Sequence, residues 1–204
     1  MIKAIISDLG NVIVFFTHHN LANGLAKYSN LVPKEINKVL IDSDLDVDFH
    51  EGKITPKEFY DGVTQMLGLS LKFDVFKEIY NGIDTGTNND FLDALNELKD
   101  RYSIVALSDT NELHAEYMKN KFSFWDLFDH KILSNEVHAS KARSPGKIFG
   151  IAVGTAGCLP EECVYIDDVE SYVEAAISIG MHGIHYKNNE ELFQELEKLG
   201  IKIN

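Results

Sequence analysis

The chain of 204 residues is poor in the residues that cross-link a chain or break its helices, with two cysteines and four prolines. Two cysteines are too few for a disulfide framework, and Cys158 and Cys163 do not form a CxxC pair. No apolar run approaches the ~20 residues that cross a membrane. The N-terminal run is interrupted by Asp8 and lacks the small-residue cleavage site of a signal peptide. We therefore expect a cytoplasmic protein that does not bind a membrane.

Positive charge is also scarce. The sequence has 19 lysines and arginines against 32 acidic residues, which gives a formal net charge of −13. Nucleic acids and anionic membranes are bound by basic patches, so this balance argues against both as partners. An anionic small molecule stays compatible with it, because a metal ion or a few lysines can supply positive charge locally. The hydrophobic fraction of 45% is typical of a globular protein with a sizeable core.

Short apolar segments alternate with helical patterns along most of the chain. The predicted strands are residues 4–7, 103–107, 130–133, 164–166 and 183–185. Between the later strands, apolar residues recur at intervals of three and four, which predicts helices. Alternating strands and helices favour a parallel sheet that is covered by helices on both faces. The expected fold class is therefore α/β, with three layers in the order α/β/α.

One long segment departs from this alternation. Within residues 15–86, only helices are predicted, and they cover residues 21–28, 33–40, 56–67 and 73–80. The run Thr55-Pro56-Lys57-Glu58 is typical of a helix start, with a capping hydroxyl, an early proline and an acidic third residue. We therefore predict an α/β core made of residues 1–14 and 87–204, and an all-helical domain, residues 15–86, inserted after the first strand.

Polar side chains follow three of the predicted strands. Asp8 interrupts the apolar run KAIISDLGNVIV, Ser108 and Asp109 follow the second strand, and Asp167 and Asp168 follow the fourth. Each could be a mere turn or helix cap. However, the carboxyl ends of parallel strands meet at one edge of a sheet, where ligands bind. Carboxylates that converge there repel one another unless a cation lies between them, and oxygen ligands suit Mg²⁺. Together these residues predict a magnesium-dependent site.

These motifs resemble those of the haloacid dehalogenase superfamily, in particular its phosphatases with a helical cap after the first strand. Asp8 in IISDLGNV matches the nucleophile motif, and Ser108 in VALSDTN matches the motif whose hydroxyl holds the phosphoryl group. The pair Asp167-Asp168 in VYIDDVESYVEAA matches the acidic motif that holds Mg²⁺. DLGNV, LSDTN followed by His114, and EGKITPKEF are similar to bacterial members that act on sugar phosphates such as glucose 1-phosphate. The resemblance covers essentially the whole chain and implies a Rossmann-like core.

The resemblance implies a mechanism and a set of site residues. Asp8 would attack phosphorus and form an aspartyl-phosphate that water hydrolyses, with Ser108 and Lys141 as its catalytic partners. The implied ligands of Mg²⁺ are Asp8, Gly10 through its carbonyl, Asp167 and Asp168. The implied substrate-binding residues are Leu9, Gly10, Asn11, Asp109 and Arg143. The expected partner is a small phosphorylated metabolite, and the expected assembly is a monomer or a weak homodimer.

Gly10 departs from the pattern of the family. The usual motif is Asp-x-Asp, whose second aspartate protonates the leaving oxygen, and here that position is a glycine. The change removes a general acid worth roughly 10²–10⁴-fold in rate. The DLGNV members also carry this glycine, so it does not by itself indicate an inactive protein. A leaving group of low pKa needs less protonation, and His18 or His19 is an alternative proton donor; we favour a solvent-facing role for both histidines.

Two further motifs also differ. The basic residue of the third motif is Lys141 when counted from Glu136, and Arg143 when counted back from Phe149. We favour Lys141 and keep Arg143 as the second choice. Tyr172 stands where the family has an asparagine that orients this lysine and the acidic loop.

Three hypotheses follow. The first is a Mg²⁺-dependent phosphatase. The second is carbon–halogen hydrolysis, which also uses an aspartate nucleophile but needs no metal, so the paired aspartates count against it. The third is a degenerate protein that binds a phosphorylated ligand or a partner without turnover, which the altered motifs would suit. A signalling receiver domain does not fit, because the helical insertion is foreign to that fold.

Overall fold

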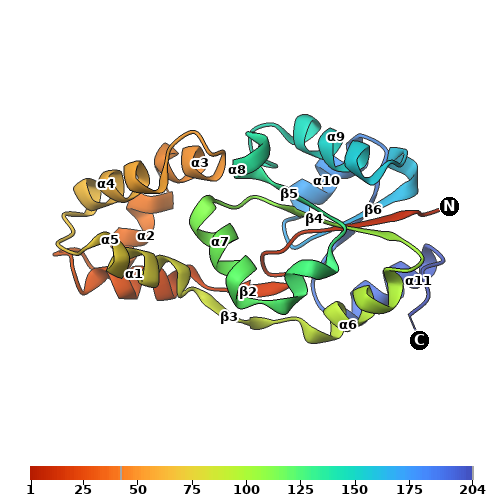
Figure 1. Ribbon diagram of the computed structural model, residues 1–204, viewed down its shortest axis with the longest axis horizontal. Helices are drawn as coiled ribbons and strands as arrows, with labels where there is room; N and C mark the ends of the chain where they lie inside the picture. The colour runs from red at the N-terminus through yellow and green to blue at the C-terminus, as the bar shows by residue number, and fades with distance from the viewer. Residues whose placement is uncertain (42, 204) are drawn as a thin grey trace.

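The computed structural model describes residues 1–41 and 43–203, apart from the side chains of His18 and Ile41. The chain forms two lobes that lie side by side, a layered core and a bundle of helices (Figure 1). The core contains a five-stranded sheet in the order β5-β4-β1-β6-β7, and every neighbouring pair is parallel. Its strands are β1 Ala4–Ser7, β4 Ser103–Ser108, β5 His130–Leu133, β6 Cys163–Asp167 and β7 His182–His185. This confirms the predicted parallel α/β fold.

Strand β1 occupies the centre of the sheet, and all four of its residues are buried. Successive side chains of a strand point to opposite faces. Accordingly, Ile5 packs with residues of α6 and α11 on one face, and Ile6 packs with residues of α9 and α10 on the other. Figure 1 shows these two helix layers on either side of the sheet. The apolar run that carries Asp8 is thus sealed from water on both faces.

The helices of the core follow the strands. They are α6 Asn89–Leu98, α7 Glu112–Lys121, α8 Ser134–Val137, α9 Pro145–Ala156, α10 Glu170–Ser178 and α11 Asn189–Lys198, with short 3₁₀ turns at Ser123–Leu127 and Pro160–Glu162. In the described part of the chain, no helix is both long and apolar enough to cross a bilayer.

The second lobe consists of helices α1 to α5 and has its own core. Its helices are α1 His18–Ala26, α2 Pro33–Ile41, α3 Asp44–His50, α4 Pro56–Leu67 and α5 Phe73–Asn81. The rings of Phe49 and Phe59 stack with their centroids 4.3 Å apart, and Phe76 and Tyr80 pack around them. Helix α4 begins with the capping box expected at Thr55. The lobe is therefore held by aromatic packing that is separate from the core of the sheet.

Two features of this lobe differ from the sequence expectation. Helix α3 was not predicted, because its residues DLDVDFH alternate polar and apolar side chains at a period of two. At the two boundaries of the predicted helical domain the chain forms an antiparallel ribbon, β2 Val14–Phe16 paired with β3 Asp84–Thr87, where no strand was predicted. This ribbon carries the chain into and out of the helical lobe, so the connection between the lobes is paired backbone rather than free loop.

Asn88 ties the start of α6 to two distant parts of the core, so its removal should be costly. Its buried side chain caps Phe91 N and donates to the carbonyl of Val12 and the hydroxyl of Tyr186. We expect Asn88→Ala to lower the free energy of unfolding by roughly 2–3 kcal/mol in chemical denaturation. The exposed cap Asn188 of α11 is the matched control, and Asn188→Ala should cost only about 1 kcal/mol. Equal losses would mean that capping alone accounts for Asn88.

Candidate active site

Three carboxylates meet at the carboxyl edge of the central strands. Asp8 follows β1. Asp167 is the last residue of β6, the neighbouring strand, and Asp168 follows it. One oxygen of each lies within 4.8 Å of those of the other two. The amide of Asp8 donates to the carbonyl of Ile166 at 2.9 Å, which fixes the two strand ends against each other. The structure therefore brings together the acidic residues that the sequence had placed at different strands.

The ammonium group of Lys141 lies buried among these acids. Its Nζ is 3.0 Å from Oδ1 of Asp8 and 2.7 Å from Oδ2 of Asp167. Burial raises the pKa of Asp8 to about 7, although the charge of Lys141 opposes this. Burial alone would lower the pKa of Lys141, but the charges of Asp8, Asp167 and their neighbours raise it well above its usual value. The geometry favours Lys141 as the basic residue of the third motif.

The donor set suits a divalent cation. With all groups ionised, the three carboxylates and Lys141 leave a net charge of −2 in a buried place, which Mg²⁺ would balance. Asp167 is heavily used within the protein, since it accepts from Lys141, from the Tyr165 hydroxyl and, at 2.8 Å, from the amide of Val169. Asp8 and Asp168 therefore have the oxygens best placed for a metal.

The loop after β4 supports the lysine. Ser108 is buried at the strand end, and the N-cap of α7 is Asn111, so capping does not explain Ser108. The carboxylate of Asp109 accepts from the amide of Lys141 at 2.9 and 3.1 Å, and burial raises the pKa of Asp109. Asp109, which was predicted to bind substrate, thus anchors the loop that carries Lys141. Asp109 also lines the cavity described next.

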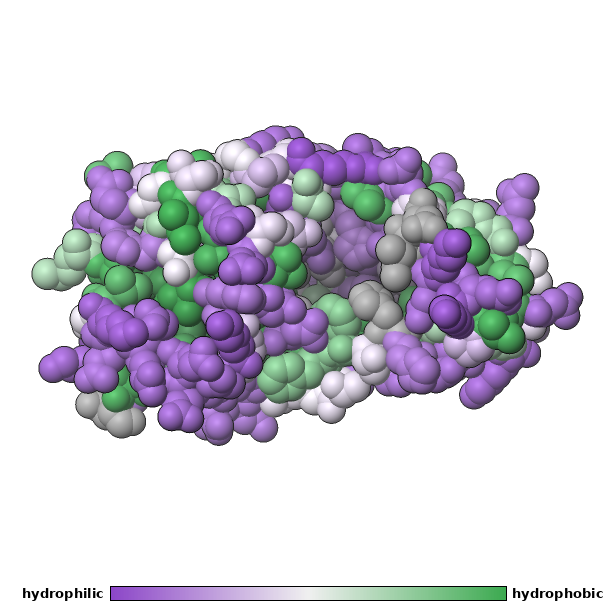
Figure 2. All heavy atoms as spheres, turned by 180° about the vertical axis from the view of Figure 1, so that it is seen from behind, coloured by the Kyte–Doolittle hydropathy of each residue, from purple (hydrophilic) through white to green (hydrophobic). Residues whose placement is uncertain are grey.

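A cavity of about 380 Å³ lies between the two lobes, next to these residues. Gly10, Ser108 and Asp109 line it from the core, and His50 and Tyr80 line it from the helical lobe. The surface between the lobes is visibly hollowed (Figure 2). The buried acids and Lys141 therefore adjoin a cleft large enough for a small ligand.

Comparisons with known proteins agree with this arrangement. No family model matches the chain. A solved enzyme of the HAD family from Bacteroides thetaiotaomicron, an aspartate-to-alanine variant in complex with magnesium and inorganic phosphate, superposes with a TM-score of 0.85 and 25% identity over 95% of this chain and 99% of that one. The chain is thus similar over almost its whole length to an enzyme of the HAD family.

Two curated proteins are similar in sequence. The D-ribitol-5-phosphate phosphatase of Bacteroides thetaiotaomicron is 24% identical over 212 residues, which cover 96% of this chain and 97% of that protein. Flavin mononucleotide hydrolase 1 of Arabidopsis thaliana is 35% identical over 66 residues. That match covers 32% of this chain and spans about a quarter of the relative, 27% of its length.

Phe16 fills the place beside Gly10. A Cβ atom at Gly10 would lie 2.8 Å from Cε1 of Phe16 and 3.5 Å from its Cζ. The position at which most superfamily phosphatases carry their acid is therefore packed against an aromatic ring from β2. Next along the chain, Asn11 adopts a positive φ of 52° and its amide lies 3.3 Å from Oδ2 of Asp168. Asn11 thus contacts the acidic motif with its side chain, a contact that the sequence did not indicate.

Tyrosine rings flank Lys141. Its Nζ is 5.0 Å from the ring centroid of Tyr172 and 6.0 Å from that of Tyr165. Two of the three N–H donors serve Asp8 and Asp167, so the ring of Tyr172 meets the remaining side of the cation. Tyr172, which replaces the asparagine of the family, therefore contacts the lysine through a ring face instead of an amide.

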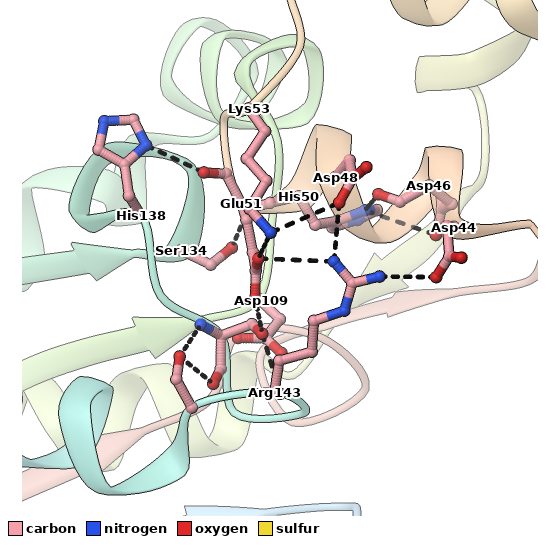
Figure 3. Close-up of polar contacts among 12 residues, drawn as sticks. Asp44, Asp46, Asp48, His50, Glu51, Lys53, Asp109, Ser134, His138 and Arg143 are labelled. Atoms are coloured by element: carbon pink, nitrogen blue, oxygen red, sulfur yellow. Dashed lines mark hydrogen bonds and ion pairs between the residues drawn. The ribbon is translucent and has the colours of Figure 1, made fainter.

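Arg143 contacts acidic residues of the helical lobe (Figure 3). Its guanidinium donates to Asp44 and Asp48 of α3, at 2.7 Å in each case. Both contacts are partly exposed. Predicted as a substrate-binding residue, Arg143 lies instead at the interface between the lobes. Sequence reasoning could not place it, because its partners belong to the helix that was not predicted.

Glu51 is a second, buried contact between the lobes. Its carboxylate accepts from Ser140 Oγ at 2.6 Å and pairs with Lys53 at 2.7 Å, and its carbonyl lies 3.0 Å from Nδ1 of His138 (Figure 3). Ser140 directly precedes Lys141. We call the contacts of Arg143 and Glu51 across the lobes the α3 latch. It holds the loop of the lysine from the side of the helical lobe.

His50 and His114 line the cavity. The side chain of His18 lies outside the described residues, and His19 is exposed on α1. His50 instead lines the cavity, with Nδ1 2.7 Å from the carbonyl of Asp46 and Nε2 3.3 Å from the amide of Asn111. His50 directly precedes the segment EGKITPKEF and is the last residue of α3. Because this helix was not predicted, the periodicity of the sequence gave no signal for His50.

Magnesium should stabilise the folded protein through Asp168. A ligand present at 100 times its Kd stabilises by about 2.7 kcal/mol, so we expect MgCl₂ to raise the Tm in thermal unfolding. Asp168→Asn should lose most of this increase, because it removes a charge from the buried acidic cluster. Asp61→Asn, which alters an exposed carboxylate of α4, should retain it. An undiminished increase in Asp168→Asn would place the metal elsewhere.

Proposed function

We propose that the protein is a Mg²⁺-dependent phosphatase that hydrolyses a small phosphorylated metabolite through an aspartyl-phosphate on Asp8. The observation that carries the proposal is the buried pair of Asp8 and Lys141, which adjoins Asp168 and the cavity between the lobes. The relatives support it, since two are named for phosphate-ester hydrolysis and a third was solved with magnesium and phosphate. The proposal keeps the expectations of a cytoplasmic location and a monomer or weak homodimer.

The first step uses Asp8 as the nucleophile. Burial raises the pKa of Asp8 to about 7, and the charge of Lys141 opposes this rise and so favours the ionised carboxylate that attacks. An oxygen of Asp8 forms a bond to phosphorus as the bond between phosphorus and the leaving oxygen breaks. The leaving oxygen then takes up a proton to give the free alcohol. Ser108 and the backbone of residues 9–11 donate hydrogen bonds to the phosphoryl oxygens. When bound by Asp8 and Asp168, Mg²⁺ neutralises charge on the same oxygens.

The second step regenerates the carboxylate. Water attacks phosphorus, the bond to Asp8 breaks, and inorganic phosphate forms. Residues 15–86 act as a cap that excludes bulk water during both steps. The α3 latch supports this role, because Arg143 and Glu51 connect the cap to the loop of Lys141.

The nucleophile can be tested directly. We expect the wild-type protein to release phosphate from at least one compound of a panel that includes D-ribitol 5-phosphate, flavin mononucleotide and glucose 1-phosphate, and EDTA to abolish the release. Asp8→Asn should lower kcat/KM on the order of 10³-fold or more, while the exposed control Asp61→Asn should not. If no compound is cleaved and Asp8→Asn changes nothing, the degenerate ligand-binding hypothesis replaces this one.

The pair Gly10 and Phe16 predicts how the rate depends on the leaving group. Because no acid stands at position 10, kcat/KM across aryl phosphates should rise steeply as the pKa of the leaving group falls. Gly10→Asp alone collides with the ring of Phe16, and Phe16→Ala removes the ring atoms that a Cβ atom at position 10 would meet. The double variant should flatten this dependence and accelerate poor leaving groups by about 10²-fold. A flat dependence in the wild type would mean that another residue donates the proton.

A further inference from the structure

The cavity has two chemically different parts. Beside the acids it is lined by the polar strand-end residues Ser108 and Asp109. A second part, which we call the apolar half, is lined by residues of the β2–β3 ribbon and its flank, of α1 and of the end of α7: Val14, Phe16, Leu21, Ile83, Met118 and Phe122. Because the phosphoryl group belongs at the acids, the apolar half is the space left for the alcohol that departs.

Two polar side chains near the apolar half, Asp84 and Tyr80, already have partners in the protein, whereas the buried Oδ1 of Asn81 accepts no hydrogen bond. Asp84 accepts from the hydroxyl of Tyr117 at 2.8 Å and from Nζ of Lys121 at 2.7 Å. The hydroxyl of Tyr80 accepts from the amide of Asn111 at 3.0 Å. Asn81 could accept from one hydroxyl of a polyol in this space, but the other hydroxyl groups would be buried against side chains that are apolar or already bonded, which weakens binding. An apolar ligand gains from the same walls by leaving water.

The apolar lining continues up to the reacting centre. The ring of Phe16 stands where a side chain on residue 10 would begin, 2.8 Å from an ideal Cβ at Gly10. The carbon atoms of the alcohol that are bonded nearest to the leaving oxygen therefore meet the ring of Phe16 and not a carboxyl group. The position of this ring next to Gly10 places part of the apolar lining close to the nucleophile.

We infer that the substrate is a phosphate monoester of an alcohol with an apolar or aromatic body, and not of a sugar or other polyol. The inference rests on the proposed function and names the substrate class of that site. The volume of about 380 Å³ is in the range of small-ligand pockets. The apolar half would hold the body of the alcohol, and Asp8 would receive the phosphoryl group.

The test compares two esters that release the same kind of alcohol. 2-Phenylethyl phosphate and glycerol 3-phosphate both have a primary alcohol as leaving group, and they differ in whether its body is apolar or polar. We expect kcat/KM in Mg²⁺ to be at least about tenfold higher for the phenylethyl ester, since burial of one ring gains far more than that factor requires. p-Nitrophenyl phosphate, whose leaving group is reactive, reports separately on whether the protein is a phosphatase.

Variants of the apolar half sharpen the test. Met118→Gln keeps the length of the side chain and makes it polar, so it should reduce the preference for the phenylethyl ester over glycerol 3-phosphate several-fold. Met66→Gln changes an exposed methionine of the cap and should leave the preference unchanged. Val14→Thr, with the exposed Val32→Thr as its control, gives a second pair in case Met118→Gln unfolds.

The outcomes separate this inference from the proposed function. If p-nitrophenyl phosphate is hydrolysed in an Mg²⁺- and Asp8-dependent manner but glycerol 3-phosphate is cleaved as well as or better than the phenylethyl ester, the substrate class is wrong and the phosphatase stands. An unchanged preference in Met118→Gln and Val14→Thr would likewise overturn the assignment of the apolar half. If none of the three esters is hydrolysed, the proposed function itself fails.

Discussion

The buried ammonium of Lys141 is the constraint on which the rest of the site depends. Three carboxylates at adjacent strand ends could not remain ionised in a dry place without a nearby cation. The sheet order supplies the acids, because β1 and β6 are neighbours and end together. The lysine must then reach them from a loop beyond β5. Asp109 holds the backbone of that loop, and Tyr165 and Tyr172 enclose the side chain.

Much of this arrangement could be predicted from the sequence. The strands are apolar runs that end at polar residues, and the parallel order of an α/β sheet places those ends together, so Asp8, Asp167 and Asp168 could be grouped. The start of α4 was also predictable, because the capping box at Thr55 is a local signal that needs no tertiary contact.

Other parts depend on contacts that no local pattern records. Helix α3 has seven residues, too few to be stable alone, and it is held by Phe49 in the core of its lobe and by the ion pairs of Arg143. The choice between Lys141 and Arg143 could not be made by counting, since both are basic and two residues apart. Only the fold separates them, by turning one toward the acids and the other toward the cap.

The loop of Lys141 is held from two sides, by Asp109 of the core and by the α3 latch of the cap. The ion pairs of Arg143 are partly exposed, and such pairs contribute only about 0–1 kcal/mol each. The buried carboxylate of Glu51, bonded to Ser140, is the more costly contact to break. The position of the cap is therefore coupled to that of the lysine through Ser140 and Arg143.

The contact between Gly10 and Phe16 also restricts how this chain can change over time. A carboxyl side chain at position 10 collides with the ring of Phe16. It therefore cannot improve protonation of the leaving group as long as that ring keeps its place. A smaller residue at position 16 opens the space first and makes the later change acceptable. The two positions thus form an ordered pair of steps, in which a residue of the connecting ribbon decides whether an acid can arise in the nucleophile loop.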